Sequence, residues 1–210
     1  MNNPLEQYIW EHSREEDNLL KSLSRATHLR ALNPQMASGH LQGQILEMLS
    51  NMIRPERILE IGTFTGYSAI CLAKGLKEGG HLHTIEINDE LEQITSDYFR
   101  KTGLGNTITQ HIGNAIDIIP KIDETFDLVF IDGDKRQYCQ YFNLVINKVR
   151  PGGFILVDNV LWHGKVVNEV VPKDKQTIGV MQFNDKIMKE EGISHVILPI
   201  RDGLMIIRKN

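Results

Sequence analysis

Residues 57–68 read RILEIGTFTGYS, an aliphatic run that passes into two glycines four residues apart and then into a helix-like stretch. Glycine lets a chain turn tightly and approach a bound molecule closely, so this stretch predicts a strand, a ligand-binding turn and a helix. A dinucleotide-binding turn has its middle glycine where this chain has Phe64. The bulk of Phe64 would crowd a diphosphate, which argues against NAD or FAD.

The same alternation continues through the rest of the chain. Four more aliphatic runs follow, at residues 81–87, 107–112, 126–131 and 154–157, and helix-like stretches lie between the runs, at residues 67–76, 90–102, 115–119 and 135–149. Apolar runs of this length suit parallel strands that are buried on both faces. We therefore expect an α/β fold, an open Rossmann-like parallel sheet with helices on both faces.

The two ends of the chain differ from its middle. Residues 4–27 and 38–53 predict two helices, separated by a break at Asn33 and Pro34. After a helix at residues 176–190, the runs 194–199 and 203–208 are joined too closely for anything but an antiparallel hairpin. The interpretation is a single domain, residues 1–210, with a helical N-terminal extension (1–53) and a Rossmann-like core (54–210).

Composition limits the possible classes of protein. The 210 residues are 41% hydrophobic with a formal net charge of −4, which is typical of a globular domain and disfavours general nucleic-acid binding. No apolar run approaches the ~20 residues that span a membrane. The two cysteines, Cys71 and Cys139, are too few for a disulfide framework, so a cytoplasmic location is expected.

Two further features suggest a nucleoside site beside the glycine turn. Glu86 closes the second run, 20 residues after Gly66, where an acid can bind the hydroxyls of a ribose. Asn114 and Ala115 follow the third run and leave room for a planar base. The alternatives are a solvated glutamate and a simple helix cap.

Oxygen-bearing side chains follow the fourth and fifth runs. If these two strands are neighbours, Asp132, Asp158 and Asn159 meet at one edge of the sheet and suit Mg²⁺, with Mn²⁺ or Ca²⁺ as alternatives. The other interpretation is that these acids cap helices or face solvent. Lys135 stands beside the cluster, where it is either a proton acceptor or the ion-pair partner of Asp134.

These segments resemble the cation-dependent O-methyltransferases, the caffeoyl-CoA and catechol O-methyltransferase-like family that uses S-adenosylmethionine. The resemblance extends from about residue 33 to 208, and its specific parts are EIGTFTGYS (60–68), IEIN (85–88), IDGDK (131–135) and VDNVLWHG (157–164). It implies a seven-stranded, mostly parallel sheet with one antiparallel strand, and a homodimer.

The resemblance also implies a role for each matching residue. The residues that would bind the cofactor are Met36, Ser38, Glu60, Gly62, Thr63, Gly66, Ser68, Glu86, Asn114, Ala115 and Asp132. Among them Glu86 would bind the ribose, and Asn114 and Ala115 would flank the adenine. Asp132, Asp158 and Asn159 would be the metal ligands, with Lys135 as the catalytic base beside Asp132.

The implied reaction is methyl transfer to a hydroxyl that has a second oxygen beside it, most simply in a catechol-like small molecule. A tRNA containing 5-hydroxyuridine offers the same oxygen pair, and a local rim of basic residues would favour it: Arg14, Lys21, Arg25, Arg30, Lys165, Lys173 and Lys175. A third hypothesis is a non-catalytic nucleoside-binding module. Residues 165–175, which would shape the acceptor site, are not diagnostic of any substrate.

Overall fold

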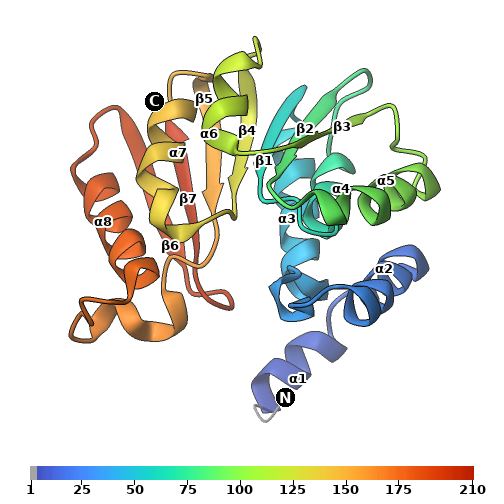
Figure 1. Ribbon diagram of the computed structural model, residues 1–210, viewed down its shortest axis with the longest axis horizontal. Helices are drawn as coiled ribbons and strands as arrows, with labels where there is room; N and C mark the ends of the chain where they lie inside the picture. Colours follow the sequence, from blue (N-terminus) through green and yellow to red (C-terminus); the bar gives the residue numbers. More distant parts are fainter. Residues whose placement is uncertain (1–3) are drawn as a thin grey trace.

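The computed structural model describes residues 4–210 and contains one seven-stranded sheet in the order β3-β2-β1-β4-β5-β7-β6 (Figure 1). Only β7 runs antiparallel, against β5 and β6. The expected Rossmann-like mixed sheet and its terminal hairpin are therefore confirmed. The strands are β1 (Arg57–Ile61), β2 (His81–Glu86), β3 (Ile108–Ile112), β4 (Phe126–Ile131), β5 (Val149–Val157), β6 (Ile193–Leu198) and β7 (Leu204–Lys209).

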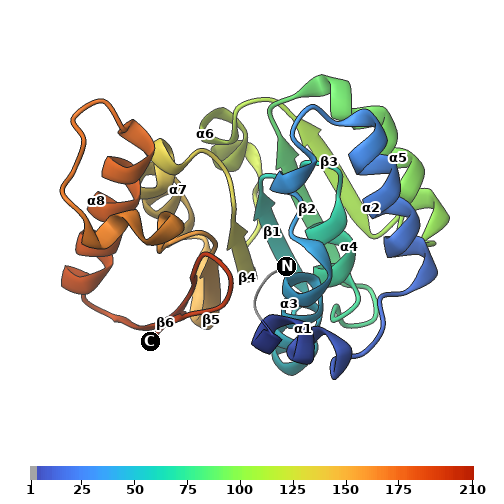
Figure 2. The ribbon, with the colours of Figure 1, turned by 90° about the horizontal axis from the view of Figure 1, so that it is seen from below.

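Helices cover both faces of this sheet (Figures 1 and 2). Side chains alternate along a strand, so Val129 and Ile131 of β4 pack with the later helices, whereas Leu128 and Phe130 pack with the earlier ones. The helices are α1 (Pro4–Glu11), α2 (Asn18–Arg30), α3 (Gly39–Ile53), α4 (Tyr67–Ala73), α5 (Glu92–Lys101), α6 (Ala115–Ile118), α7 (Tyr138–Val145) and α8 (Lys175–Lys189). Short 3-10 helices occupy Pro34–Met36, Asp89–Leu91, Ile119–Lys121, Lys135–Gln137 and Trp162–Val167.

Several predicted bounds were wrong. The single helix expected over residues 4–27 is two helices, because the Asp17 side chain accepts a hydrogen bond from the Leu20 amide at 2.8 Å and so starts α2 afresh. The strand expected at 154–157 begins five residues earlier, at Val149, and the preceding helix ends at Val145. The break at Asn33 and Pro34 is confirmed.

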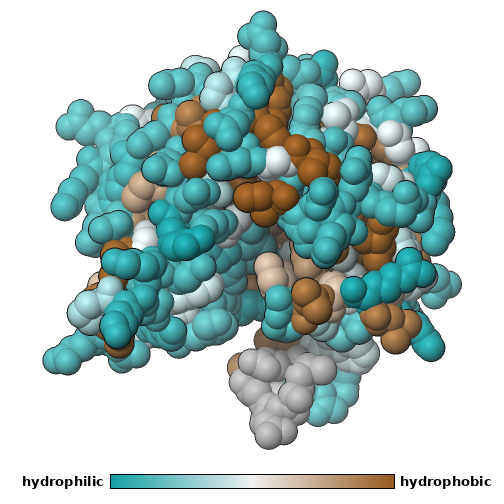
Figure 3. Space-filling view, viewed as in Figure 1, coloured by the Kyte–Doolittle hydropathy of each residue, from teal (hydrophilic) through white to brown (hydrophobic). Residues whose placement is uncertain are grey.

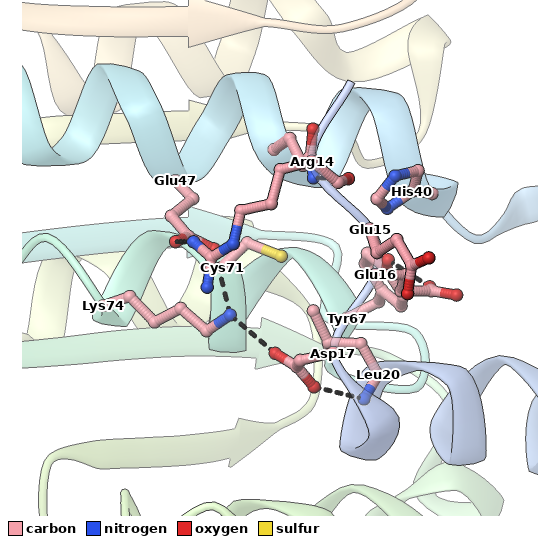
Figure 4. A pocket seen from close by; sticks show the side chains of 11 residues that line it. Arg14, Glu15, Glu16, Asp17, Leu20, His40, Glu47, Tyr67, Cys71 and Lys74 are labelled. Carbon is pink, nitrogen blue, oxygen red and sulfur yellow. Dashed lines mark hydrogen bonds and ion pairs between the residues drawn. The ribbon is translucent and has the colours of Figure 1, made fainter. Parts of the chain in front are cut away.

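The segment between α1 and α2 is attached to the core by ion pairs (Figure 4). Lys74, just after α4, contacts Asp17 at 2.8 Å and Glu47 of α3 at 2.9 Å, and Arg14 reaches Glu47 at 3.2 Å. The hydroxyl of Tyr67 donates a hydrogen bond to a carboxylate oxygen of Glu16 at 2.5 Å. These contacts hold the extension against the helix that follows the glycine turn.

The surface seen in Figure 3 is mainly hydrophilic, with apolar side chains in several separate places. Within residues 4–210, no helix has both the length and the apolar composition needed to cross a membrane.

The register of the central strands determines which residues meet at the carboxyl edge of the sheet. Ile61 of β1 pairs with Ile131 of β4, and Ile131 pairs with Val157 of β5, all in parallel. The residues that follow these three, Gly62, Asp132 and Asp158, are therefore level with one another. Neighbouring strands lie about 4.8 Å apart, so this edge brings the glycine turn beside both acids.

Candidate active site

The glycine turn forms one wall of a small, partly open hollow at this edge. The opposite wall is the segment between α2 and α3, whose Met36 is exposed and whose Ser38 is buried. Six of the residues predicted to bind a cofactor line this hollow together: Met36, Ser38, Gly62, Thr63, Ser68 and Asp132.

Gly62 and Gly66 are required by the local geometry. A Cβ at Gly62, where φ is +100°, would lie 2.3 Å from the carbonyl oxygen of Asp132. At Gly66, where φ is +87°, a Cβ would lie 2.8 Å from the ring of Phe99. The two glycines therefore let the turn press against β4 on one side and α5 on the other.

Glu60 is completely buried at the end of β1. One carboxylate oxygen accepts a hydrogen bond from the Thr84 hydroxyl at 2.5 Å, while Oε1 has no hydrogen-bond partner in the described structure. Burial raises the pKa of Glu60 to about 8. A buried carboxyl group with one free oxygen fits a cationic group such as the ammonium of an amino acid.

Glu86, at the end of β2, braces the glycine turn. Its carboxylate accepts hydrogen bonds from the backbone amides of Phe64 at 2.7 Å and Asn88 at 2.9 Å. The first of these bonds holds Phe64 in a left-handed conformation, with φ of 48°. The interpretation of Glu86 as a merely solvated glutamate was wrong, because its side chain is buried. A carboxylate has lone pairs left for a ribose diol.

Asn114 and Ala115 lie beside Glu86, because the Gly113 amide bonds to the Glu86 carbonyl at 2.7 Å. The Asn114 side chain accepts a hydrogen bond from the Ile116 amide at 3.0 Å and so caps α6, as one of the two sequence interpretations expected. Ala115 is buried. The ends of β1, β2 and β3, which are predicted to contact a nucleoside, thus lie at one edge of the sheet.

Asp132 and Asp158 are neighbours, as the sequence hypothesis required. The Asp132 amide bonds to the Ile61 carbonyl at 2.8 Å, and the Asp158 amide bonds to the Ile131 carbonyl at 3.0 Å, so the strand register continues into both residues. Burial, together with the negative charge of Asp132, raises the pKa of Asp158 to about 6. A buried carboxyl group beside a second negative charge suits a cation between them.

Asn159 completes the predicted set, in a left-handed conformation with φ of 56°. Over residues 4–210 no group of three or more His, Cys, Asp and Glu side chains is arranged for a metal ion. The predicted set has only two such residues, and its third member is an amide. Two carboxylates and an amide are hard oxygen donors, which fit Mg²⁺ or Ca²⁺ better than Zn²⁺.

Lys135 belongs to the same cluster. Its Nζ lies 2.7 Å from Oδ1 of Asp132 and is almost fully buried, close to the aromatic rings of Tyr138 and Trp162. The predicted alternative of an ion pair with Asp134 was wrong, because Asp134 pairs with Arg136 and caps the turn that Lys135 begins. Lys135 thus shares a carboxylate with the predicted metal site.

Three side chains outside the predicted set of ligands and cofactor-binding residues support Asp158. The hydroxyl of Tyr138 donates to the Asp158 carbonyl at 2.9 Å, and Nε2 of Gln42 donates to its carboxylate at 2.6 Å. Arg201 contacts Gln42 from the far end of the chain. Gln42 and Arg201 stand 159 positions apart, so no local pattern could have paired them.

The fold and the site define a methyltransferase-type α/β protein. The model of the O-methyltransferase family matches residues 10–210, so the chain belongs to that family and is an enzyme of the methyl-transfer class. The hypothesis of a non-catalytic nucleoside-binding module is therefore not supported.

Named relatives give the same result. The chain is 32% identical to a catechol O-methyltransferase of Niastella koreensis, over 88% of this chain and 84% of the relative. It is 31% identical to a caffeoyl-CoA O-methyltransferase of Petroselinum crispum, over 98% and 90%.

Solved structures agree as well. The O-methyltransferase TomG of Streptomyces achromogenes, in complex with S-adenosylmethionine (SAM), superposes with a TM-score of 0.90 at 30% identity, covering 99% of this chain and 96% of TomG. An O-methyltransferase of Bacillus cereus, in complex with S-adenosylhomocysteine (SAH), superposes with a TM-score of 0.91 at 28% identity, covering 98% of this chain and 97% of the relative.

Proposed function

We propose that the chain transfers the methyl group of S-adenosylmethionine (SAM) to a hydroxyl of a catechol-like small molecule, with the help of a divalent cation. The observation that carries the proposal is the position of Asp132. This residue lines the hollow formed by the glycine turn and is level with Asp158 on the neighbouring strand. A methyl donor in the hollow would therefore lie directly beside the acid pair.

The proposed binding of SAM rests on the contacts of the hollow and on the SAM and SAH complexes of the two structural relatives. Oε1 of Glu60 would accept a hydrogen bond from the ammonium of the methionine portion. Gly62, Thr63, Gly66 and Ser68 surround that portion. Glu86 binds the ribose, Asn114 and Ala115 flank the adenine, and Met36 and Ser38 close the hollow.

The proposed metal ligands are Asp132, Asp158 and Asn159, with Mg²⁺ as the first candidate and Mn²⁺ or Ca²⁺ as alternatives. A divalent cation there would lower the pKa of an acceptor hydroxyl that has a second oxygen beside it. In its neutral form, which a cation held by Asp132 would favour, Nζ of Lys135 is the proposed proton acceptor, because it is buried within the same cluster. The protein itself aligns the methyl donor with the acceptor hydroxyl.

The named relatives act on catechol and caffeoyl-CoA, which supports a catechol-like acceptor. The tRNA alternative has no support in the family match or in the named relatives. Three of the residues expected to form a basic rim pair with acids instead: Arg14 with Glu47, Lys21 with Glu15, and Lys165 with Asp174.

Three broader expectations remain part of the proposal. The single sheet favours one catalytic domain with a helical extension. The exposed apolar residues of α1, among them Tyr8 and Trp10, favour a homodimer. Both cysteines are free, which suits a cytoplasmic protein.

Turnover with methyl-labelled SAM tests the proposal directly. A panel of catechols and a hydroxyuridine-containing tRNA should be offered in parallel, with Mg²⁺ and with a chelator. We expect methylation of a catechol that the chelator abolishes. Methylation of the tRNA alone would overturn the acceptor assignment, and full activity in the chelator would overturn the metal assignment.

A further inference from the structure

A chain of hydrogen bonds runs from the hairpin between β6 and β7 to the carboxylate of Asp158. Nη1 of Arg201, in the hairpin turn, donates to Oε1 of Gln42 at 2.6 Å. Nε2 of Gln42 then donates to Oδ2 of Asp158 at 2.6 Å. Gln42 and Asp158 are both buried, with exposed fractions of 3% and 4%, so water does not compete for the bond between them.

The donors and acceptors in this series of hydrogen bonds have only one consistent arrangement. A guanidinium group can only donate, so it must meet the oxygen of the Gln42 amide. The NH₂ group of that amide must then face Asp158. Arg201 therefore determines which way round the Gln42 amide lies, and the amide presents a donor to one oxygen of the acid.

We propose that Gln42 is a positioning residue for Asp158, and that Arg201 sets the orientation of Gln42. The proposal rests on the assignment of Asp158 as a metal ligand. By binding Oδ2, Gln42 fixes the rotation of the carboxylate, so that Oδ1 would be the oxygen available to a cation. Groups that orient a ligand in this way are typically worth 10–100-fold in metal affinity.

The same turn of the hairpin also holds other walls of the site. Arg201 donates a second hydrogen bond to the carbonyl of Ser38, in the segment that lines the cofactor hollow. The carbonyls of Asp202 and Gly203 accept bonds from the amides of Leu161 and Val160, just after Asn159. The hairpin thus connects the segments on either side of the proposed metal site.

The test is the affinity of the full-length protein for Mn²⁺, measured by electron paramagnetic resonance in the presence of saturating S-adenosylhomocysteine (SAH). Gln42→Met keeps the length of the side chain and removes its hydrogen bonds. Gln44→Met, on the same helix but facing the N-terminal segment, is the matched control. Arg201→Met, in an exposed turn, leaves Gln42 in place but frees its amide to rotate.

We expect Gln42→Met to lower the Mn²⁺ affinity by about 10–100-fold. Arg201→Met should lower it by less, and the double variant should be no weaker than Gln42→Met alone, because Arg201 acts through Gln42. Gln44→Met should bind as the wild type does. A merely structural role would lower the thermal stability of the variants without changing the Mn²⁺ affinity of the folded protein.

The possible outcomes distinguish the positioning role of Gln42 from the assignment of the metal site. If the wild type binds Mn²⁺ and Gln42→Met binds it within twofold, the positioning role is overturned while the metal site stands. If the wild type binds no divalent cation, the metal assignment fails and the positioning role with it. If Gln42→Met does not fold, unchanged Mn²⁺ affinity in Arg201→Met overturns the role given to Arg201.

Discussion

Replacing Gly62 with alanine should destabilise the protein through a single contact. The new Cβ would lie 2.3 Å from the carbonyl oxygen of Asp132, which is backbone and cannot rotate away. Overpacking of this kind costs about 1–3 kcal/mol, and a left-handed backbone costs a residue with a Cβ about 1–2 kcal/mol. We take a total of about 3 kcal/mol from these two ranges.

For a chain of this length each kcal/mol lowers the melting temperature by about 2–4 °C, so Gly62→Ala should lose about 6–12 °C. Gly79→Ala is the matched control, because Gly79 also has a positive φ, of 74°, but a Cβ there would meet nothing within 4 Å. The control should therefore show only the backbone cost, about 1–2 kcal/mol. Circular dichroism during heating measures both variants.

Equal melting temperatures in the two variants would refute the reasoning, because the close approach to Asp132 would then have no energetic consequence. The same substitution should also weaken binding of SAH, since relief of the overlap must move the turn or the end of β4. Isothermal titration calorimetry of the folded variant below its melting temperature measures this second effect.

Three other substitutions test the site. Asp158→Ala should lower metal-dependent turnover by at least about 100-fold while leaving SAH affinity within about twofold, and full turnover of this variant in a chelator would contradict the metal assignment. Glu86→Ala should weaken SAH binding by about 10–100-fold in calorimetry, as loss of hydrogen bonds to a charged group implies, and unchanged affinity would remove the ribose assignment. Because the pKa of Glu60 is raised to about 8 in the folded state, the free energy of unfolding without cofactor should fall as pH rises from about 5 to 8. Glu60→Gln should flatten this fall in urea titrations, and an equal slope in both proteins would show that Glu60 does not titrate there.

The strands of the core could be predicted from sequence because each is buried on both faces and so reads as a continuous apolar run. The terminal hairpin could be predicted because its connection is too short for a crossover. The order of the strands was open, and the meeting of Asp132 and Asp158 depended on the condition that β4 and β5 are neighbours. The observed pairing of Ile131 with Val157 meets that condition.

The errors have local and long-range causes. The start of α2 was missed because a charged run with apolar residues at helical spacing hides the cap at Asp17. The early start of β5 was missed because Pro151 and the glycines after it are typical of turns, yet they lie in a strand that pairs at its beginning with β4. The contact between Gln42 and Arg201 depends on the whole fold, so no spacing in the sequence indicates it.

Asp132 connects the two halves of the proposed chemistry. Its carbonyl oxygen lies only 2.3 Å from where a Cβ at position 62 would be, so the glycine turn can approach β4 only because that Cβ is absent. Its carboxylate contacts Lys135 and neighbours Asp158. The register of β1 against β4 therefore determines how far the cofactor hollow lies from the proposed metal ligands. Any change that moves the glycine turn relative to β4 should alter methyl transfer even when every proposed ligand is intact.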